Sequence, residues 1–187
     1  MLMPISRWRS LNSGRYRYTE AAQSECVFNP TGVQMTSIIQ IRPVTPDDYA
    51  QWRPLWDGYN AFYGRVNDTA LPEPITETTW QRLLDPAEPV HALVAVENSK
   101  TVGLVHYLFH RSTTRLHDVC YLNDLFTLPS CRNRGVGRQL IEAVYAAAKS
   151  TGSSRVYWQT QATNVAGRAL YDKVASHAGF IIYAHEL

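Results

Sequence analysis

Arginine and glycine are concentrated in the run Arg132–Arg138, which reads Arg-Asn-Arg-Gly-Val-Gly-Arg. The run follows a strand-like segment, residues 120–127, and opens a stretch with helical periodicity. Backbone N–H groups at the start of a helix have no partner within the helix, and the helix dipole favours negative charge there. Glycines let an anion approach the backbone closely, and the guanidinium groups add positive charge. The run is therefore predicted to bind a phosphate group.

Two common nucleotide-binding loops are excluded by single positions after this run. The dinucleotide fingerprint needs a third glycine, but position 140 is Leu. The P-loop needs a lysine followed by Ser or Thr, whereas Arg138-Gln139 stands there. What remains is Arg-x-x-Gly-x-Gly between a strand and a helix.

A second stretch, Asn164-Val-Ala-Gly-Arg-Ala-Leu-Tyr171 followed by Gly179-Phe180, completes a pattern. Together the two motifs resemble those of the GNAT-superfamily N-acetyltransferases, whose Gln/Arg-x-x-Gly-x-Gly/Ala signature binds the pyrophosphate of acetyl-CoA. The resemblance extends from about Ile38 to Tyr183. It implies a GNAT fold of the α/β class, with a mixed, mostly antiparallel sheet that splays between its fourth and fifth strands and is flanked by helices.

The resemblance also implies roles for individual residues. Tyr171 would be the general acid for the departing thiolate; the alternative is a core aromatic on a buried helix face. The splayed strand would pair with the pantetheine arm of acetyl-CoA, and its exposed N–H groups would stabilise the oxyanion. The residues implied to bind the co-substrate are Leu125, Phe126, Thr127, Arg132, Asn133, Arg134, Gly135, Val136, Gly137, Arg138 and Asn164.

The residues around Asp124 bear on the acceptor. The segment Tyr121–Thr127 resembles Tyr-Leu-Glu-Asp in the branch that acetylates polyamines, small amines or histone-like lysines, with Asn123 in place of Glu. Neighbouring residues on a strand face opposite sides, so Asp124 is not expected to replace that Glu simply. The proton acceptor is left open between Asp124, Glu97 and a histidine, reached through water. Asp124 is equally compatible with a buried structural acceptor.

The expected reaction is acetyl transfer from acetyl-CoA to a primary amine, either a small molecule, a polyamine or a lysine side chain, by direct attack. Asn123, Tyr59 and Tyr63 are expected to line the acceptor pocket, since aromatic faces attract an amine cation. The alternative is a non-catalytic acyl-CoA-binding regulator on the same fold. A homodimer is implied only by the resemblance.

The elements that must hold these residues alternate between strand and helix patterns. Strands are expected over residues 37–42, 91–97, 101–109, 118–127, 155–161 and 180–183, and helices from Pro46, around Trp80, after Gly137 and over residues 164–177. Pro54 should kink or shorten the first helix. Residues 1–34 are predicted to be a basic extension, flexible or a mis-called start, before an acetyltransferase domain over residues 35–187.

Composition excludes several other classes. A net charge of +2 is too small to indicate nucleic-acid binding, and no apolar run approaches the roughly 18 residues that span a bilayer. The three cysteines are scattered, which argues against disulfides and a zinc site and favours a cytoplasmic protein. His106 and His110 would lie about 13 Å apart on one strand, too far for one zinc ion, so no metal is expected.

Overall fold

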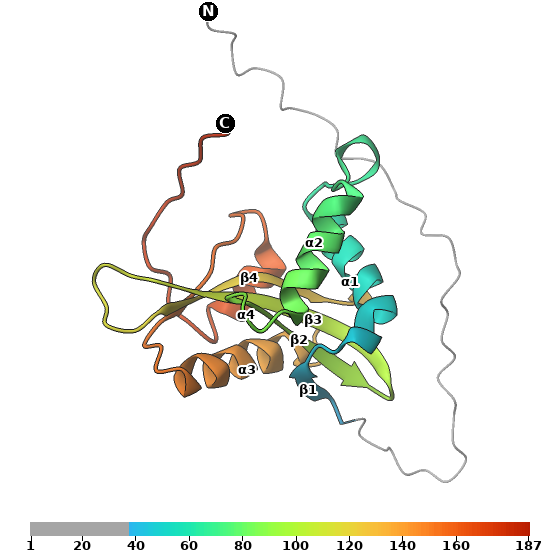
Figure 1. Cartoon of the computed structure of the whole chain (residues 1–187), viewed down its shortest axis with the longest axis horizontal. Coiled ribbons are helices and arrows are strands. Elements are labelled where there is room, and N and C mark those ends of the chain that lie inside the picture. Colours follow the sequence, from blue (N-terminus) through green and yellow to red (C-terminus); the bar gives the residue numbers. More distant parts are fainter. Residues whose placement is uncertain (1–37) are drawn as a thin grey trace, which may run out of the picture. The chain divides into compact units, whose positions relative to one another are not determined.

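The computed structural model describes residues 38–187. The predicted basic extension, residues 1–34, and the predicted domain start at residue 35 lie outside this part of the chain. Five strands form one sheet in the order β1-β2-β3-β4-β5 (Figure 1). They are β1 (Gln40–Pro43), β2 (Val90–Glu97), β3 (Lys100–His110), β4 (Val119–Thr127) and β5 (Val156–Tyr157). Neighbouring strands are antiparallel except β4 and β5, which are parallel. The predicted mixed sheet is confirmed.

The helices pack on both faces of the sheet (Figure 1). The α-helices are α1 (Tyr49–Phe62), α2 (Glu73–Leu84), α3 (Val136–Ser150) and α4 (Val165–Tyr171), and short 3-10 turns are η1 (Pro46–Asp48), η2 (Asn67–Thr69) and η3 (Pro129–Cys131). One core cluster joins α1 and α2 to the sheet, and a second joins α3. Neighbours on β3 show the alternation, because Leu104 belongs to the first cluster and Val105 to the second.

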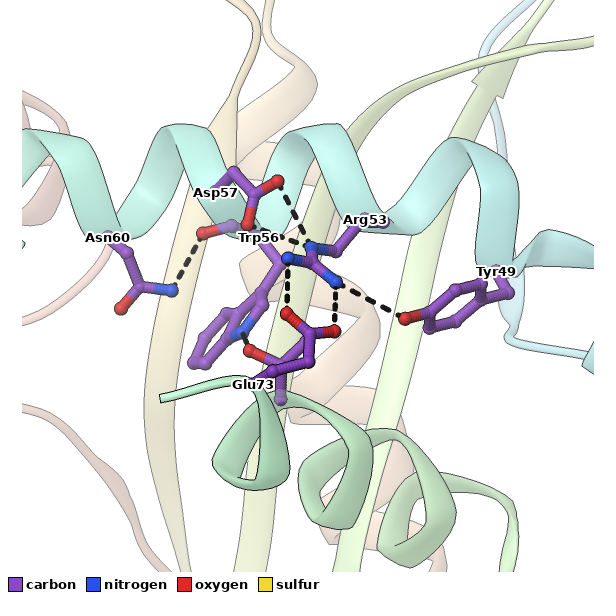
Figure 2. Close-up of polar contacts among 7 residues, drawn as sticks. Tyr49, Arg53, Trp56, Asp57, Asn60 and Glu73 are labelled. Atoms are coloured by element: carbon purple, nitrogen blue, oxygen red, sulfur yellow. Dashed lines mark hydrogen bonds and ion pairs between the residues drawn. The ribbon is translucent and has the colours of Figure 1, made fainter. Parts of the chain in front are cut away.

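Helix α1 buries the aromatic stripe that its spacing predicts, with Trp52, Trp56 and Tyr59 in the core. Pro54 does not end the helix, which continues to Phe62. Its ring is exposed, so water can hydrate the carbonyl group that a proline leaves without a donor. Figure 2 shows how α2 is fastened to α1: Arg53 pairs with Glu73 of α2, and the indole N–H of Trp56 donates to Thr76 of α2 at 3.2 Å.

Strand β4 contains a bulge at Asn123, because His106 pairs with Asp124 while Tyr107 pairs with Leu122. The extra residue changes the alternation of side chains: Leu122 lies in the α3 cluster, whereas Phe126 lies in the α1 cluster. Asp124 points to the same face as Phe126, toward α1. Asn123 is exposed whereas Asp124 is buried, and the Asn123 side chain still helps to lower the pKa of the Asp124 carboxyl.

The sheet opens beyond the first residues of β4. Strand β5 pairs only with Cys120 and Tyr121. From Leu122 onward, β4 therefore has a free edge on the side away from β3. This confirms the predicted splay between the fourth and fifth strands.

The end of the chain differs from the sequence expectation. The strand expected over residues 155–161 is only Val156–Tyr157, and the helix expected over residues 164–177 ends at Tyr171. Residues 180–183 form no strand, and Phe180 and Tyr183 are 78% and 86% exposed. A short apolar run specifies a strand only where an edge can pair with it, and two-residue β5 offers little edge. In the described part of the chain, no helix has the length and apolarity needed to cross a membrane.

Candidate active site

A cleft of about 540 Å³ is bounded by the free edge of β4, the start of α3 and helix α4. It brings together nearly all the residues that the sequence assigns to the co-substrate, together with Tyr63 at the end of α1. Those in its wall are Leu125, Phe126, Thr127, Arg132, Asn133, Gly135, Val136, Gly137, Arg138 and Asn164. Tyr171, the expected general acid, also lines it. The residues of the two sequence motifs thus lie on one continuous surface, the wall of this cleft.

The loop before α3 has the backbone shape of an anion site. Asn133 and Gly135 both have positive φ angles, 59° and 83°. The first hydrogen bond of α3 runs from the Gln139 N–H to the Gly135 carbonyl. The N–H groups of residues 136–138 therefore have no partner within the helix. They lie at the positive end of the helix dipole, next to the cleft. Successive N–H groups in such a turn form a concave anion-binding surface.

The arginines of the loop do not act alike. Arg132 lines the cleft, with its Nε donating to the Thr127 carbonyl at 3.3 Å. Arg134 is absent from the cleft wall and pairs with Glu97 at the end of β2, with Nη1 donating to Oε2 at 3.0 Å. Arg134 thus pairs with Glu97 and does not line the cleft. It also ties Glu97, one candidate proton acceptor, to that arginine.

Asn164 has a structural role at the cleft. Its Oδ1 accepts the Gly167 N–H at 3.0 Å, so it caps α4, and its Nδ2 donates to Thr160 Oγ1 at 2.9 Å. A Cβ atom at Gly167 would lie 2.4 Å from Asn164 Nδ2. Gly167 therefore keeps the cap in place, a role that sequence reasoning missed although a glycine three residues after a capping Asn is a readable signal.

Tyr171 packs and also faces the cleft. Its ring lies edge-on to Trp158 at 5.4 Å, and it is part of the cleft wall. Burial raises the pKa of Tyr171 to about 12. The phenol therefore keeps its proton at neutral pH, and the two expectations for this residue are compatible.

Asp124 lies at the end of a buried hydrogen-bond chain. The indole N–H of Trp52 donates to His106 Nε2 at 2.9 Å, and His106 Nδ1 lies 2.9 Å from Asp124 Oδ2. An indole only donates, so Nε2 accepts, the imidazole proton sits on Nδ1, and Nδ1 donates to Asp124. His106 is 2% exposed and Asp124 5%. These two hydrogen bonds link α1, β3 and β4 and fix the position of the Asp124 carboxylate.

The hydrogen bonds keep Asp124 ionised in this dry setting. Burial alone would raise the pKa of Asp124, but hydrogen bonds from His106, Tyr59 and Asn123 outweigh burial and hold the pKa below its ordinary value. The sequence named His106 only in weighing a metal site, and left the proton acceptor open to an unspecified histidine. Within residues 38–187, no group of three His, Cys, Asp or Glu side chains is placed to hold a metal ion.

Tyrosines surround this carboxylate. Tyr59 hydrogen-bonds Asp124, and its ring centroid lies 5.0 Å from that of Tyr63, which lines the cleft. On the other side, the Tyr121 ring lies 5.0 Å from Tyr157. Electron-rich ring faces around one anion form a site suited to a cationic amine. Asp124, Tyr59 and Asn123 do not themselves belong to the cleft wall, and Tyr63 connects them to it.

Comparison with known proteins gives a consistent picture. The sequence model described as "Acetyltransferase (GNAT) family" matches residues 52–175. The chain is 34% identical over 147 residues to "D-amino-acid N-acetyltransferase HPA3" of Saccharomyces cerevisiae, covering 78% of this chain and 89% of that protein. It is 29% identical over 147 residues to "Uncharacterized N-acetyltransferase YhfO" of Bacillus subtilis, covering 78% and 95%.

Solved structures show the same fold at lower identity. AAC(6')-Iy in complex with a bisubstrate analogue of CoA and acetylneamine superposes with a TM-score of 0.69 at 19% identity, covering 81% of this chain and 99% of that one. A ribosomal-protein-alanine N-acetyltransferase from Brucella melitensis gives 0.66 at 18% identity, covering 80% and 99%.

Proposed function

Because this chain belongs to the Acetyltransferase (GNAT) family, we propose that it transfers the acetyl group of acetyl-CoA to a primary amine by direct attack in a ternary complex. One observation carries this most directly. A single cleft joins the anion-binding turn before α3 to the free edge of β4 and to Tyr171, and Tyr63 connects it to the ionised Asp124. The part of the site that would hold acetyl-CoA is thus continuous with the part that would hold the acceptor amine.

The residues present fit acetyl-CoA. The N–H groups at the start of α3, with Arg132 and Arg138, would hold the pyrophosphate, and the free edge of β4 would pair with the pantetheine amides. A Cβ at Gly137 would lie 3.1 Å from the end of the Leu170 side chain, so a larger residue there would have to push α4 slightly away from α3. When bound, acetyl-CoA supplies a thioester carbonyl as the electrophile.

Asp124 first attracts the protonated amine by charge. Its low pKa makes it a poor base toward a free ammonium ion, so the attacking species is the neutral amine. As the C–N bond forms, the nitrogen becomes acidic, and its proton passes through the Tyr59 hydroxyl to Asp124. Tyr171 donates a proton to the sulfur as the C–S bond breaks and is reprotonated by solvent.

The acceptor named by the relatives differs between them. The Saccharomyces protein is named for D-amino acids, and the AAC(6')-Iy complex contains an aminoglycoside analogue. Polyamines and lysine side chains also belong to the proposed range. Incubating the protein with acetyl-CoA and a panel of amino acids, amines, polyamines, aminoglycosides and lysine peptides, and measuring CoA release, tests the function. CoA binding with no release for any amine would instead indicate a regulator. A cytoplasmic homodimer remains a prediction.

Replacing Tyr171 by phenylalanine should lower kcat about 10²-fold, because the leaving thiolate loses its proton donor. Acetyl-CoA affinity should change less than about twofold, since the ring still packs on Trp158. Steady-state kinetics and calorimetric binding measure the two effects. Tyr183→Phe, at an exposed tyrosine, is the matched control. An unchanged kcat in Tyr171→Phe would remove the acid role.

The pH dependence of kcat/KM should show one rising limb. The pKa of Asp124 lies below its ordinary 3.8 and that of Tyr171 is about 12, so neither group changes charge between ~pH 5 and ~pH 10. The rate should therefore rise about tenfold per pH unit until the amine of the acceptor is deprotonated. Acceptors whose amines differ in pKa should shift the break by the same amount. A break at one fixed pH for every acceptor would show that a protein group titrates instead.

A further inference from the structure

The turn after α1 fixes the backbone position of Arg65. Gly64 has a φ of +79°, the Gly64 N–H donates to the Ala61 carbonyl at 3.0 Å, and the Arg65 N–H donates to the Asn60 carbonyl at 3.0 Å. These two bonds form a Schellman motif, which fixes how the chain leaves a helix. The backbone of Arg65 is therefore set by the helix end.

The side chain of Arg65 is held as well. Its Nη1 donates to Asn60 Oδ1 at 3.0 Å. Asn60 is buried, and its Nδ2 donates to the Trp56 carbonyl at 2.9 Å, as Figure 2 shows. Asn60 is thus locked to the helix and in turn orients the guanidinium. Most of the five N–H donors of Arg65 are left for another partner.

The exposed guanidinium lies beside Tyr63, although Arg65 itself is not part of the cleft wall. Its carbon is 5.9 Å from the ring centroid of Tyr63, which is part of the cleft wall. Tyr63 in turn packs on Tyr59, which hydrogen-bonds Asp124. Arg42, Arg53 and Arg134 pair with carboxylates, whereas Arg65 pairs with none in the described part of the chain. Among residues 38–187, a guanidinium without a carboxylate partner therefore stands near a site that ends in a fixed anion.

We propose that Arg65 binds the carboxylate of a free amino acid whose amine is directed toward Asp124. This rests on the proposed acetyl transfer and names its acceptor class. A guanidinium binds a carboxylate through two parallel hydrogen bonds, which gives orientation as well as charge. A zwitterion matches the cation and the anion of the site together. A polyamine would place a second positive charge near Arg65, so the same residue disfavours that class.

The experiment compares four acceptors with the 187-residue protein: L-leucine, D-leucine, leucinamide and putrescine. CoA release gives kcat/KM, corrected for the fraction of free amine. With the wild type, the preferred enantiomer of leucine should exceed leucinamide by about 10- to 100-fold, as expected for a charge-assisted bond. Arg65→Ala should bring the ratio near one, Arg65→Lys should restore part of it, and Arg65→Glu should favour leucinamide and putrescine. Acetyl-CoA affinity should stay unchanged throughout.

Arg82→Glu is the matched control, because Arg82 is an exposed arginine of α2 outside the cleft wall. It makes the same charge change and should keep the wild-type ratio. Equal use of leucine and leucinamide by the wild type, or an equal loss of both in Arg65→Glu, would overturn the role of Arg65 while leaving acetyl transfer intact. Failure of the wild type to acetylate any amine would instead contradict the proposed function.

Discussion

Replacing Asp124 by asparagine is expected to lower kcat/KM for the acceptor amine by about 10²- to 10⁴-fold, the usual range for removing a proton-transfer group. The amide keeps the size of the carboxylate but loses its charge and its ability to take the proton that leaves the attacking nitrogen. The donor end of the cleft should be unaffected, because Asp124 is not part of the cleft wall. Steady-state kinetics and acetyl-CoA titration measure both quantities.

Asp118→Asn provides the control for this substitution. Asp118 also pairs with another side chain, that of Arg111, but it is 36% exposed and precedes β4. It should leave kcat/KM within about twofold of the wild type. If Asp124→Asn binds acetyl-CoA normally and turns over at the wild-type rate, the proton must leave by another route and Asp124 is a structural acceptor.

Replacing Gly135 by valine should weaken acetyl-CoA binding about 10- to 100-fold. The φ of +83° at Gly135 is costly for a β-branched residue, by about 1–3 kcal/mol, so the turn should rearrange and move the N–H groups at the start of α3. Isothermal calorimetry with acetyl-CoA measures the loss. The KM of the amine should change little at saturating acetyl-CoA, because its groups lie on α1 and β4.

Gly152→Val is the control that separates the effect of backbone strain on stability from the loss of acetyl-CoA affinity. Gly152 also has a positive φ, +79°, but it follows the far end of α3. Both variants should lose a similar amount of unfolding free energy in urea, while only Gly135→Val should lose affinity. Equal affinities in the two variants would show that the turn before α3 does not bind the co-substrate.

The donor half of the site was predictable because its signals are local. The shape of the turn at residues 132–138 depends on glycines and on the start of one helix, all visible in seven adjacent positions. The cap at Asn164 is equally local. The ion pair of Arg134 was not predictable, because its partner Glu97 lies 37 residues earlier in the chain and no local pattern specifies such a pair.

The acceptor half was not predictable in the same way. The bond between Trp52 and His106 joins residues 54 positions apart, and only the packing of α1 on the sheet brings them together. The spacing of Trp52 signals a core position, and nothing in it signals a hydrogen-bond donor. The strand expected at residues 180–183 failed for a related reason, since the apolar pattern says nothing about whether an edge is available.

Because of the bulge in β4, the residue at position 123 can be exchanged without disturbing the core. If Asn123 is left out, Leu122, Asp124, Leu125 and Phe126 alternate regularly between the two faces, so the extra residue contributes nothing to core packing. Its side chain is exposed, yet it helps to lower the pKa of the Asp124 carboxyl. Chemistry next to Asp124 can therefore vary at this one position, with Asn here and Glu in the branch that the strand resembles, while the fold beneath it stays the same.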